Sequence, residues 1–145
     1  MKELNIPDNF DGQKYFDAQG DYPQSHKPGY LLVPDEITQD DINSYVKTLD
    51  EFKREKIDRL WLKATAYEYS YVANGGYSAL LELKLAGSSK AASFGDWIKT
   101  IWTEYYARRD QVTASHSQEI IDLINEDFST VGPPPYLIRE VLFGE

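Results

Sequence analysis

One aromatic stripe in the second half of the chain constrains its fold more than any other feature. Between residues 94 and 105, large apolar side chains recur at the i, i+3, i+4, i+7, i+8 and i+11 positions that share one face of an α-helix. These side chains are Phe94, Trp97, Ile98, Ile101, Trp102 and Tyr105. Because such a face must bury against another element, the stripe predicts a packed helix in a mainly helical domain.

Similar signals predict further helices after Pro34. Thr38, three residues before Asp41, is expected to cap a helix that has acidic residues in its first turn. The apolar face that follows slips out of register between Phe52 and Ile57, which fits either one bent helix or two. Asn74-Gly75-Gly76 is then expected to end the helical run as a C-cap.

Residues 67–86 allow two interpretations. Tyrosines and then leucines alternate on either side of Asn74-Gly75, which is typical of a β-hairpin. The alanine and leucine content of residues 79–86 instead favours a short helix that ends before Gly87. We favour the helix.

The remaining helices are bounded by capping and stop signals. Ser88 or Ser89 is expected to cap the helix that holds the aromatic stripe and runs to about Val112. Ser115-His116-Ser117-Gln118 has the spacing of a capping box, and Gly132 with the following prolines stops the helix that it opens. Residues 136–143 form a last apolar segment, expected to be a short helix or a docking strip.

The first thirty residues have a different character, since their turn signals lie too close together for a long element. Gly29–Pro34 is the exception, because its apolar run is rich in strand formers and closed by proline. We therefore expect residues 1–36 to form an irregular N-terminal arm with a short extended segment. Residues 37–145 are expected to form a single helical domain with a proline-bounded C-terminal segment, and at most a short strand or hairpin completes the mainly α fold.

Composition narrows the function classes. The 145 residues fit one domain, and the absence of cysteine removes disulfides, thiolate metal sites and cysteine nucleophiles. The net charge of −9 comes from acidic ends around a slightly basic middle, whereas a phosphate-binding surface needs a concentrated basic face. No apolar run has the ~20 residues that span a membrane. We expect a cytoplasmic protein that binds neither nucleic acid nor membranes directly.

No residue pattern indicates catalysis, a cofactor or a metal. The two histidines, His26 and His116, lie ninety residues apart, and no serine sits in a nucleophile-elbow pattern. The aspartates of the N-terminal arm do not reproduce a calcium-loop spacing. A glycosidase-like pair would have to come from Glu68, Glu82, Asp96 and Glu104, and nothing selects one pair. Asp96 and Glu104 are more simply explained as residues that stabilise the helix, since Glu104 can form an ion pair with Arg108 at i, i+4.

The aromatic side chains are the remaining candidates for function. Tyrosine buries an apolar ring and keeps a hydroxyl within reach of water, so the eleven tyrosines suit a protein interface. Most of Trp61, Trp97, Trp102 and Tyr105 are expected to be core, whereas the tyrosines around residue 70 cannot all face inward. We expect a partner-binding surface that includes Tyr69, Tyr71, Tyr77, Tyr136 and Phe143.

About the last eighty residues carry a loose pattern of aromatics, glycine and proline. Its parts are Asn74-Gly75-Gly76-Tyr77, Lys90-Ala91-Ala92, Trp97-Ile98, Trp102, Tyr105-Tyr106, Arg108-Arg109, Asp127-Phe128-Ser129, Gly132-Pro133-Pro134-Pro135-Tyr136 and Arg139-Glu140. This pattern resembles small bacteriophage tail and tail-fibre assembly proteins of the chaperone type. The resemblance implies a non-enzymatic protein of an infected or lysogenic bacterial cell that engages a tail or fibre polypeptide during assembly.

Two other classes of protein remain open. The acidic residues Asp35, Glu36, Asp40, Asp41 and Asp50 would suit a phage-encoded inhibitor that presents carboxylates in place of phosphates to a host nucleic-acid-binding protein. A structural virion subunit is the other alternative, which would be present in mature particles. Unpaired aromatic faces would also suit a homo-oligomer, although no heptad demands one.

Overall fold

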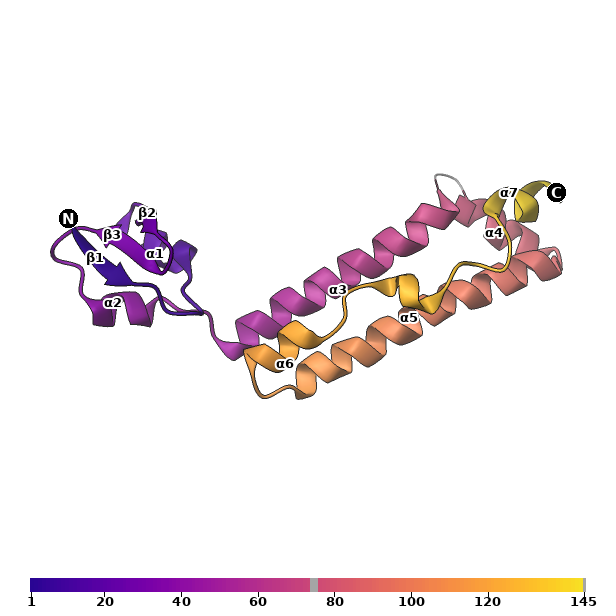
Figure 1. Ribbon diagram of the computed structural model, residues 1–145. Coiled ribbons are helices and arrows are strands. Elements are labelled where there is room, and N and C mark those ends of the chain that lie inside the picture. The colour runs from indigo at the N-terminus through magenta and orange to yellow at the C-terminus, as the bar shows by residue number, and fades with distance from the viewer. Residues whose placement is uncertain (74–75, 145) are drawn as a thin grey trace. The chain divides into compact units, whose positions relative to one another are not determined.

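The computed structural model describes residues 1–73 and 76–144, apart from the side chain of His26. Asn74 and Gly75, which were expected to form a helix C-cap, lie outside the described residues. In chain order the elements are β1 (Lys2–Asn5), α1 (Gly12–Gln19), β2 (Gln24–Lys27), β3 (Tyr30–Val33), α2 (Gln39–Ser44), α3 (Leu49–Val72), α4 (Gly76–Leu85), α5 (Ser89–Ala114), α6 (Gln118–Leu123), the 3-10 helix η1 (Phe128–Val131) and α7 (Ile138–Phe143). The prediction of a mainly helical fold is confirmed (Figure 1).

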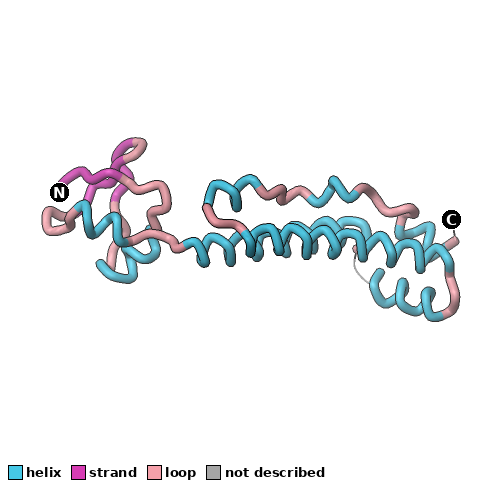
Figure 2. The backbone as a smooth tube through the Cα atoms, turned by 90° about the horizontal axis from the view of Figure 1, so that it is seen from below, coloured by secondary structure: helices cyan, strands magenta, loops and turns pink. Residues whose placement is uncertain are grey.

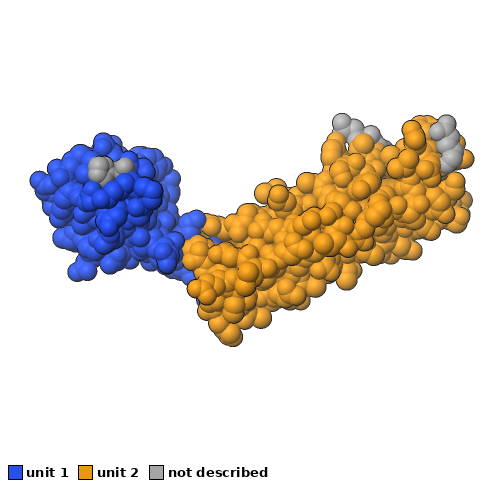
Figure 3. Space-filling model, in the orientation of Figure 1, with its two compact units in different colours: residues 1–51 blue, residues 52–145 orange. Residues whose placement is uncertain are grey.

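The chain divides into two compact units, residues 1–51 and residues 52–145 (Figure 3). The boundary expected after Glu36 therefore falls inside the first unit. The reason is burial, because Ile37 and Ile42 pack in the same apolar core as Tyr15, Leu31 and Val33. Residues 37–51 complete the N-terminal unit instead of starting the helical one.

The N-terminal unit has more regular structure than its turn signals indicate. β3 is the central strand of an antiparallel sheet with the order β1-β3-β2. Each strand has only four residues, which is why the turn residues between them lie so close together. The extended segment expected at Gly29–Pro34 is confirmed as β3, with Leu31 and Val33 buried on its core side.

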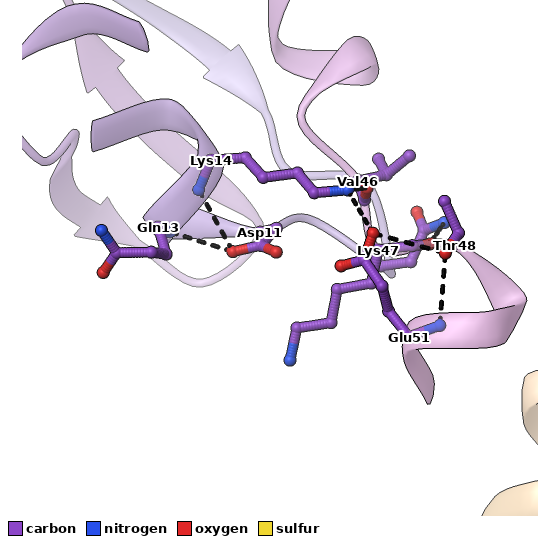
Figure 4. A network of polar contacts seen from close by, with 8 residues as sticks. Asp11, Gln13, Lys14, Val46, Lys47, Thr48 and Glu51 are labelled. Atoms are coloured by element: carbon purple, nitrogen blue, oxygen red, sulfur yellow. Dashed lines mark hydrogen bonds and ion pairs between the residues drawn. The ribbon is translucent and has the colours of Figure 1, made fainter. Parts of the chain in front are cut away.

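A polar network closes this unit at its C-terminal end (Figure 4). Lys14 Nζ donates hydrogen bonds to the Val46 carbonyl oxygen (2.8 Å) and to Glu51 Oε1 (2.6 Å), so it ties α1 to the chain around the start of α3. The Glu51 backbone N–H donates to Thr48 Oγ1 (3.2 Å) in the first turn of α3. The hydrogen bond from Lys14 also lowers the pKa of Glu51. These contacts explain why the unit extends to Glu51.

The first helical signals resolve into two helices. Thr38 caps α2, as predicted, since its Oγ1 accepts from the Asp41 backbone N–H. The Thr38 backbone N–H donates to Asp41 Oδ2 and completes a capping box, and hydrogen bonds from the Thr38 backbone and side chain lower the pKa of Asp41. α2 ends at Ser44, so the interruption comes before Phe52 and not at the register slip after it. α3 passes through the slip unbroken.

The register slip in α3 has a physical cause. The buried residues of this helix recur at every fourth position: Lys56, Leu60, Ala64, Glu68 and Val72. Charged side chains thus occupy two inward positions, and a search for apolar periodicity sees a gap there. Burial of such groups requires partners that hold them.

In the helical unit α3 and α5 run antiparallel, because Lys53 Nζ donates to the Thr113 carbonyl oxygen (2.8 Å) while Tyr71 packs on Trp97. Residues 124–137, which we call the strap, include η1 and lie along this helix pair (Figure 1). In the view turned by 90°, the strap lies on one side of the pair and α4 lies on the other (Figure 2). None of the helices in the described part of the chain is long and apolar enough to cross a membrane.

The other helix predictions are largely confirmed. α3 extends to Val72 and α4 covers Gly76–Leu85, so the hairpin alternative for residues 67–86 is wrong. Ser88 caps α5, which ends at Ala114. The capping box expected at residues 115–118 places the start of α6 two residues too early, because Ser117 and not Ser115 accepts the capping hydrogen bond. The last apolar segment forms α7.

Candidate interaction surface

The face of the α3–α5 pair under the strap is held by buried polar groups. Lys56 is 1% exposed, and its ammonium donates to Glu126 Oε2 (2.7 Å). Arg59 Nε adds a second contact to the same carboxylate (3.3 Å). Burial alone would raise the pKa of Glu126, but the hydrogen bond and charge of Lys56, with Arg59, lower it. The strap is therefore fastened to α3 by a paired, partly buried carboxylate.

Arg108 fastens the strap to α5. Its guanidinium donates to the Asn125 and Asp127 carbonyl oxygens (3.0 and 2.9 Å) and to Thr130 Oγ1 (2.9 Å). It also pairs with Glu104 (3.0 Å), as the i, i+4 spacing predicted, and lies 4.3 Å from the ring centre of Phe128. The expected pairing with Glu104 is confirmed, and Arg108 has a structural role.

Two aromatic donors complete the covered face. The hydroxyl of Tyr67 and the indole N–H of Trp97 both donate to the Gly132 carbonyl oxygen, each at 2.8 Å. Tyr71 packs edge-on against Tyr67 and Trp97, with ring centres 5.4 and 5.3 Å away. The aromatic donors of this face thus have their partners within the chain.

On the opposite face of α3 and α5, α4 covers one end, and the rest of that face is not covered by the strap. Four large apolar side chains on it remain about half exposed: Trp61 (49%), Leu62 (59%), Tyr69 (46%) and Tyr106 (50%). We call these four residues the open aromatic face. A groove of about 410 Å³ adjoins two of them and is lined by Asp58, Trp61, Leu62 and Tyr105. Tyr105 forms its floor, since it is only 7% exposed.

Buried Glu68 marks the end of this face next to α4. Its Oε1 accepts from the Trp102 indole N–H (3.0 Å) and its Oε2 accepts from the Tyr77 hydroxyl (2.7 Å). Desolvation first, and then the hydrogen bond to Glu68, raises the pKa of Tyr77. These bonds fix the two aromatic rings and join α4 to both long helices.

The five residues expected at a partner surface lie in different surroundings. Tyr69 belongs to the open aromatic face, and Tyr77 is 42% exposed but bonded to Glu68. Tyr71 is half-buried on the covered side. Tyr136 is half-buried with the Lys90 ammonium 5.3 Å from its ring centre, and Phe143 is 75% exposed beside α4. Their contact with a partner stays a prediction.

Trp61, Leu62 and Tyr106 are the surface residues that the sequence interpretation missed. Of the four aromatics of which most were expected in the core, Trp97 and Tyr105 are buried and Trp102 is half-buried, and Trp61 is the exception at 49% exposed. A usable signal existed in α5, where Trp97 and Tyr106 lie on opposite sides at 100° per residue. An aromatic arc of that width cannot bury against one neighbouring helix.

The candidate catalytic groups are dispersed. His116 is exposed, and Glu68, Asp96 and Glu104 are each held by different neighbours, the last two by Lys99 and Arg108. Among the described residues, no three histidine, aspartate or glutamate side chains come together in a way that could hold a metal ion.

Comparison with known proteins adds no relative. No protein-family model, curated protein or solved structure matches this chain.

Proposed function

We propose that this protein is a non-enzymatic binding protein that holds a segment of a partner polypeptide on its open aromatic face. The observation that carries the proposal is the half exposure of Trp61, Leu62, Tyr69 and Tyr106 on a helix pair whose other side carries the strap. Monomeric proteins keep such side chains scattered, and contiguous groups of them mark interaction sites.

The geometry suits an interface with a few dominant contacts. Tryptophan and tyrosine contribute most binding energy in interfaces, because they bury large rings at small cost in conformational entropy. Trp61 flanks the groove, and Tyr105 gives it a rigid floor. The Trp61 indole N–H has no hydrogen-bond partner among the described residues, so a main-chain carbonyl of the partner can accept from it.

We infer the partner class from the resemblance of the last eighty residues. On this proposal the partner is a phage tail or tail-fibre polypeptide, and the protein acts as a chaperone-like assembly factor in the cytoplasm of an infected or lysogenic bacterium. An apolar fibre segment would lie on the open aromatic face until the fibre assembles. The net charge of −9 would keep this complex in solution.

The inhibitor alternative draws less support from the contacts. It needs free carboxylates, and of its five candidates Asp41 is committed to the cap of α2 and Asp35 lies 3.1 Å from the N-terminal ammonium. A structural virion subunit makes the same contacts as an assembly factor and differs from it in its fate. The virion subunit remains in the mature particle, and the assembly factor is released.

An affinity pull-down from cells that express the neighbouring genes tests the proposal. The tagged protein is compared with a Trp61→Ala/Tyr106→Ala variant and with a control, Leu85→Ala/Leu123→Ala, which removes apolar side chains that are 80% and 84% exposed elsewhere. We expect a tail or fibre polypeptide that resists high salt and is lost only from the first variant. Capture of a host nucleic-acid-binding protein that high salt releases would replace the proposal with the inhibitor.

A further inference from the structure

The N-terminal unit contains a separate cleft that the proposed function does not use. It has a volume of about 520 Å³, within the range of small-ligand sites. Its walls include the side chains of Tyr15, Gln19, Asp21, Tyr22, Gln24 and Glu36. They come from α1, β2 and the connections that follow α1 and β3, so folding of the unit assembles the cleft.

The charge of this cleft is negative and unpaired. Asp21 and Glu36 both line it, and neither has a hydrogen bond or ion pair with another described residue. The N-terminal ammonium of Met1, which also borders the cleft, lies 3.1 Å from Asp35. The surrounding unit strengthens the field, because residues 1–51 carry eleven acidic and four basic side chains. A cation is thus the ligand that this cleft attracts.

The hydroxyl of a buried tyrosine gives the second and independent observation. Tyr15 is 2% exposed and lines the cleft, and no described residue forms a hydrogen bond with its hydroxyl. Burial raises the pKa of Tyr15, and the charges of Tyr45, Asp21 and Glu36 raise it further. The hydroxyl therefore stays protonated, and it retains lone pairs for a donor. Because the rest of the side chain is buried, this hydroxyl is the part of Tyr15 that a ligand in the cleft can reach.

An aromatic wall stands beside these acceptors. The ring of Tyr22 stacks on Phe16, with ring centres 4.5 Å apart and an interplanar angle of 21°. The Tyr22 hydroxyl donates to Gln13 Oε1 (2.9 Å), which fixes the ring although the residue is 58% exposed. A fixed, exposed ring next to carboxylates is a surface on which a planar cation can stack.

We propose that this cleft binds the guanidinium group of an arginine side chain on a partner protein. A guanidinium is planar, so it can stack on Tyr22 while its five N–H donors reach Asp21, Glu36 and the Tyr15 hydroxyl. A lysine ammonium presents three donors, is more strongly hydrated and cannot stack as a plane. The site lies wholly in the N-terminal unit, so it stands or falls independently of the open aromatic face.

The test is an NMR titration of the full ¹⁵N-labelled chain with Nα-acetyl-arginine amide. We expect binding in the millimolar range, with shifts confined to residues around Tyr15 and Tyr22. The Asp21→Asn/Glu36→Gln variant should bind about tenfold more weakly, because it removes two charge-assisted contacts. The matched control is Asp8→Asn/Asp40→Asn, which removes the same charge from exposed positions outside the cleft and should change affinity less than about twofold.

Ligand variants complete the test. The citrulline amide, which keeps the shape and loses the charge, should show no saturation, and the lysine amide should bind more weakly than arginine. Free arginine is included because the natural ligand could be the amino acid instead of an arginine side chain in a protein. Tighter binding of free arginine than of the amide would contradict the proposal that the ligand belongs to a partner protein. The proposed site would be contradicted if the control variant lost as much affinity as Asp21→Asn/Glu36→Gln. Citrulline amide binding as tightly as arginine amide, or no binding of arginine amide to the wild-type chain, would contradict it as well.

Discussion

The two faces of the α3–α5 pair use similar residues in opposite ways. Under the strap, Trp97 and Tyr67 donate to one backbone carbonyl, and Lys56 and Arg108 are buried with partners. On the open side, Trp61 keeps half its surface in water, and its indole N–H has no partner among the described residues. The covered face shows how the α3–α5 pair holds the strap. The open face presents comparable aromatic groups, and no described segment of this chain lies on Trp61 in the same way.

This difference separates stability from binding. A group that is buried with its partners costs folding free energy when it is removed, whereas an exposed ring costs little until a partner covers it. Substitutions on the covered face should therefore lower stability, and substitutions on the open face should lower affinity. Each of the following measurements tests that separation.

A matched pair of tryptophans should give the largest contrast. Trp97→Ala removes a ring that is 7% exposed and packed on Phe94, Tyr67 and Tyr71, so it should lower the free energy of unfolding by about 4 kcal/mol. Trp61→Ala removes a half-exposed ring and should cost about 1 kcal/mol or less. Urea unfolding of both variants measures this, and equal losses would mean that both faces serve stability.

The Lys56–Glu126 pair should give the next effect. Glu126→Gln leaves the ammonium of Lys56, which is 1% exposed, beside a neutral group and should cost about 2–3 kcal/mol. Adding Lys56→Met should restore most of this loss, because an apolar side chain of similar length suits the site. A double variant as unstable as Glu126→Gln alone would show that the carboxylate acts through Arg59 instead.

The sequence could predict the helices better than the faces that they present. Period and caps located α5, α4 and the Thr38 cap, because these depend on neighbours in the chain. Lys56 and Glu68 could not be recognised as buried, since their partners Glu126 and Trp102 lie 70 and 34 residues away. The N-terminal fold was obscured for a related reason, because its short strands are stable only as a paired sheet around Tyr15.

The exposure of Trp61 on the open aromatic face could not be predicted from the sequence. It shares a helical stripe with Leu60 and Ala64, both fully buried, and one residue of offset puts it at the edge of the buried side. Whether that edge is covered depends on where the strap and α4 lie, and neither position follows from local pattern. The sequence thus indicated an aromatic contact surface but could not decide which aromatics form it.

Acid should act on the covered face before the open one. The pKa of Glu126 is lowered in the folded state, so the carboxylate stabilises the fold above its unfolded pKa, and this contribution is lost as the pH falls through the folded value. Asp127 is shifted in the same direction by hydrogen bonds from Ser129. Unfolding free energy should stay level from pH 7 to about 5 and fall below about pH 4.5.

The Glu126→Gln variant tests the origin of that acid dependence. It should show a shallower fall in unfolding free energy at low pH, while Trp61→Ala should keep the wild-type slope. An unchanged slope in Glu126→Gln would assign the acid dependence to other carboxylates. The strap would then not be the part of the helical unit that acid loosens.

Thr65 should give the smallest effect and the opposite sign. Its Oγ1 is buried without a hydrogen-bond partner in the described part of the chain, and the residue lies one helical turn after Trp61 in α3. Thr65→Val replaces the hydroxyl by a methyl group of similar size, so it should raise the free energy of unfolding by about 0.5–1 kcal/mol. Thermal unfolding measures this as a Tm that is a few degrees higher.

Binding by the same variant decides what the hydroxyl is for. If the partner covers Trp61 by apolar contact alone, Thr65→Val should bind as tightly as wild type while unfolding at higher temperature. If the variant is more stable and yet binds several-fold more weakly, the partner supplies the hydrogen bond that the folded chain lacks, and the open aromatic face then matches the covered face in combining aromatic packing with hydrogen bonds to a bound chain. A variant that is less stable than wild type would show that Thr65 already has a partner, most simply a water molecule, and that its hydroxyl belongs to the fold.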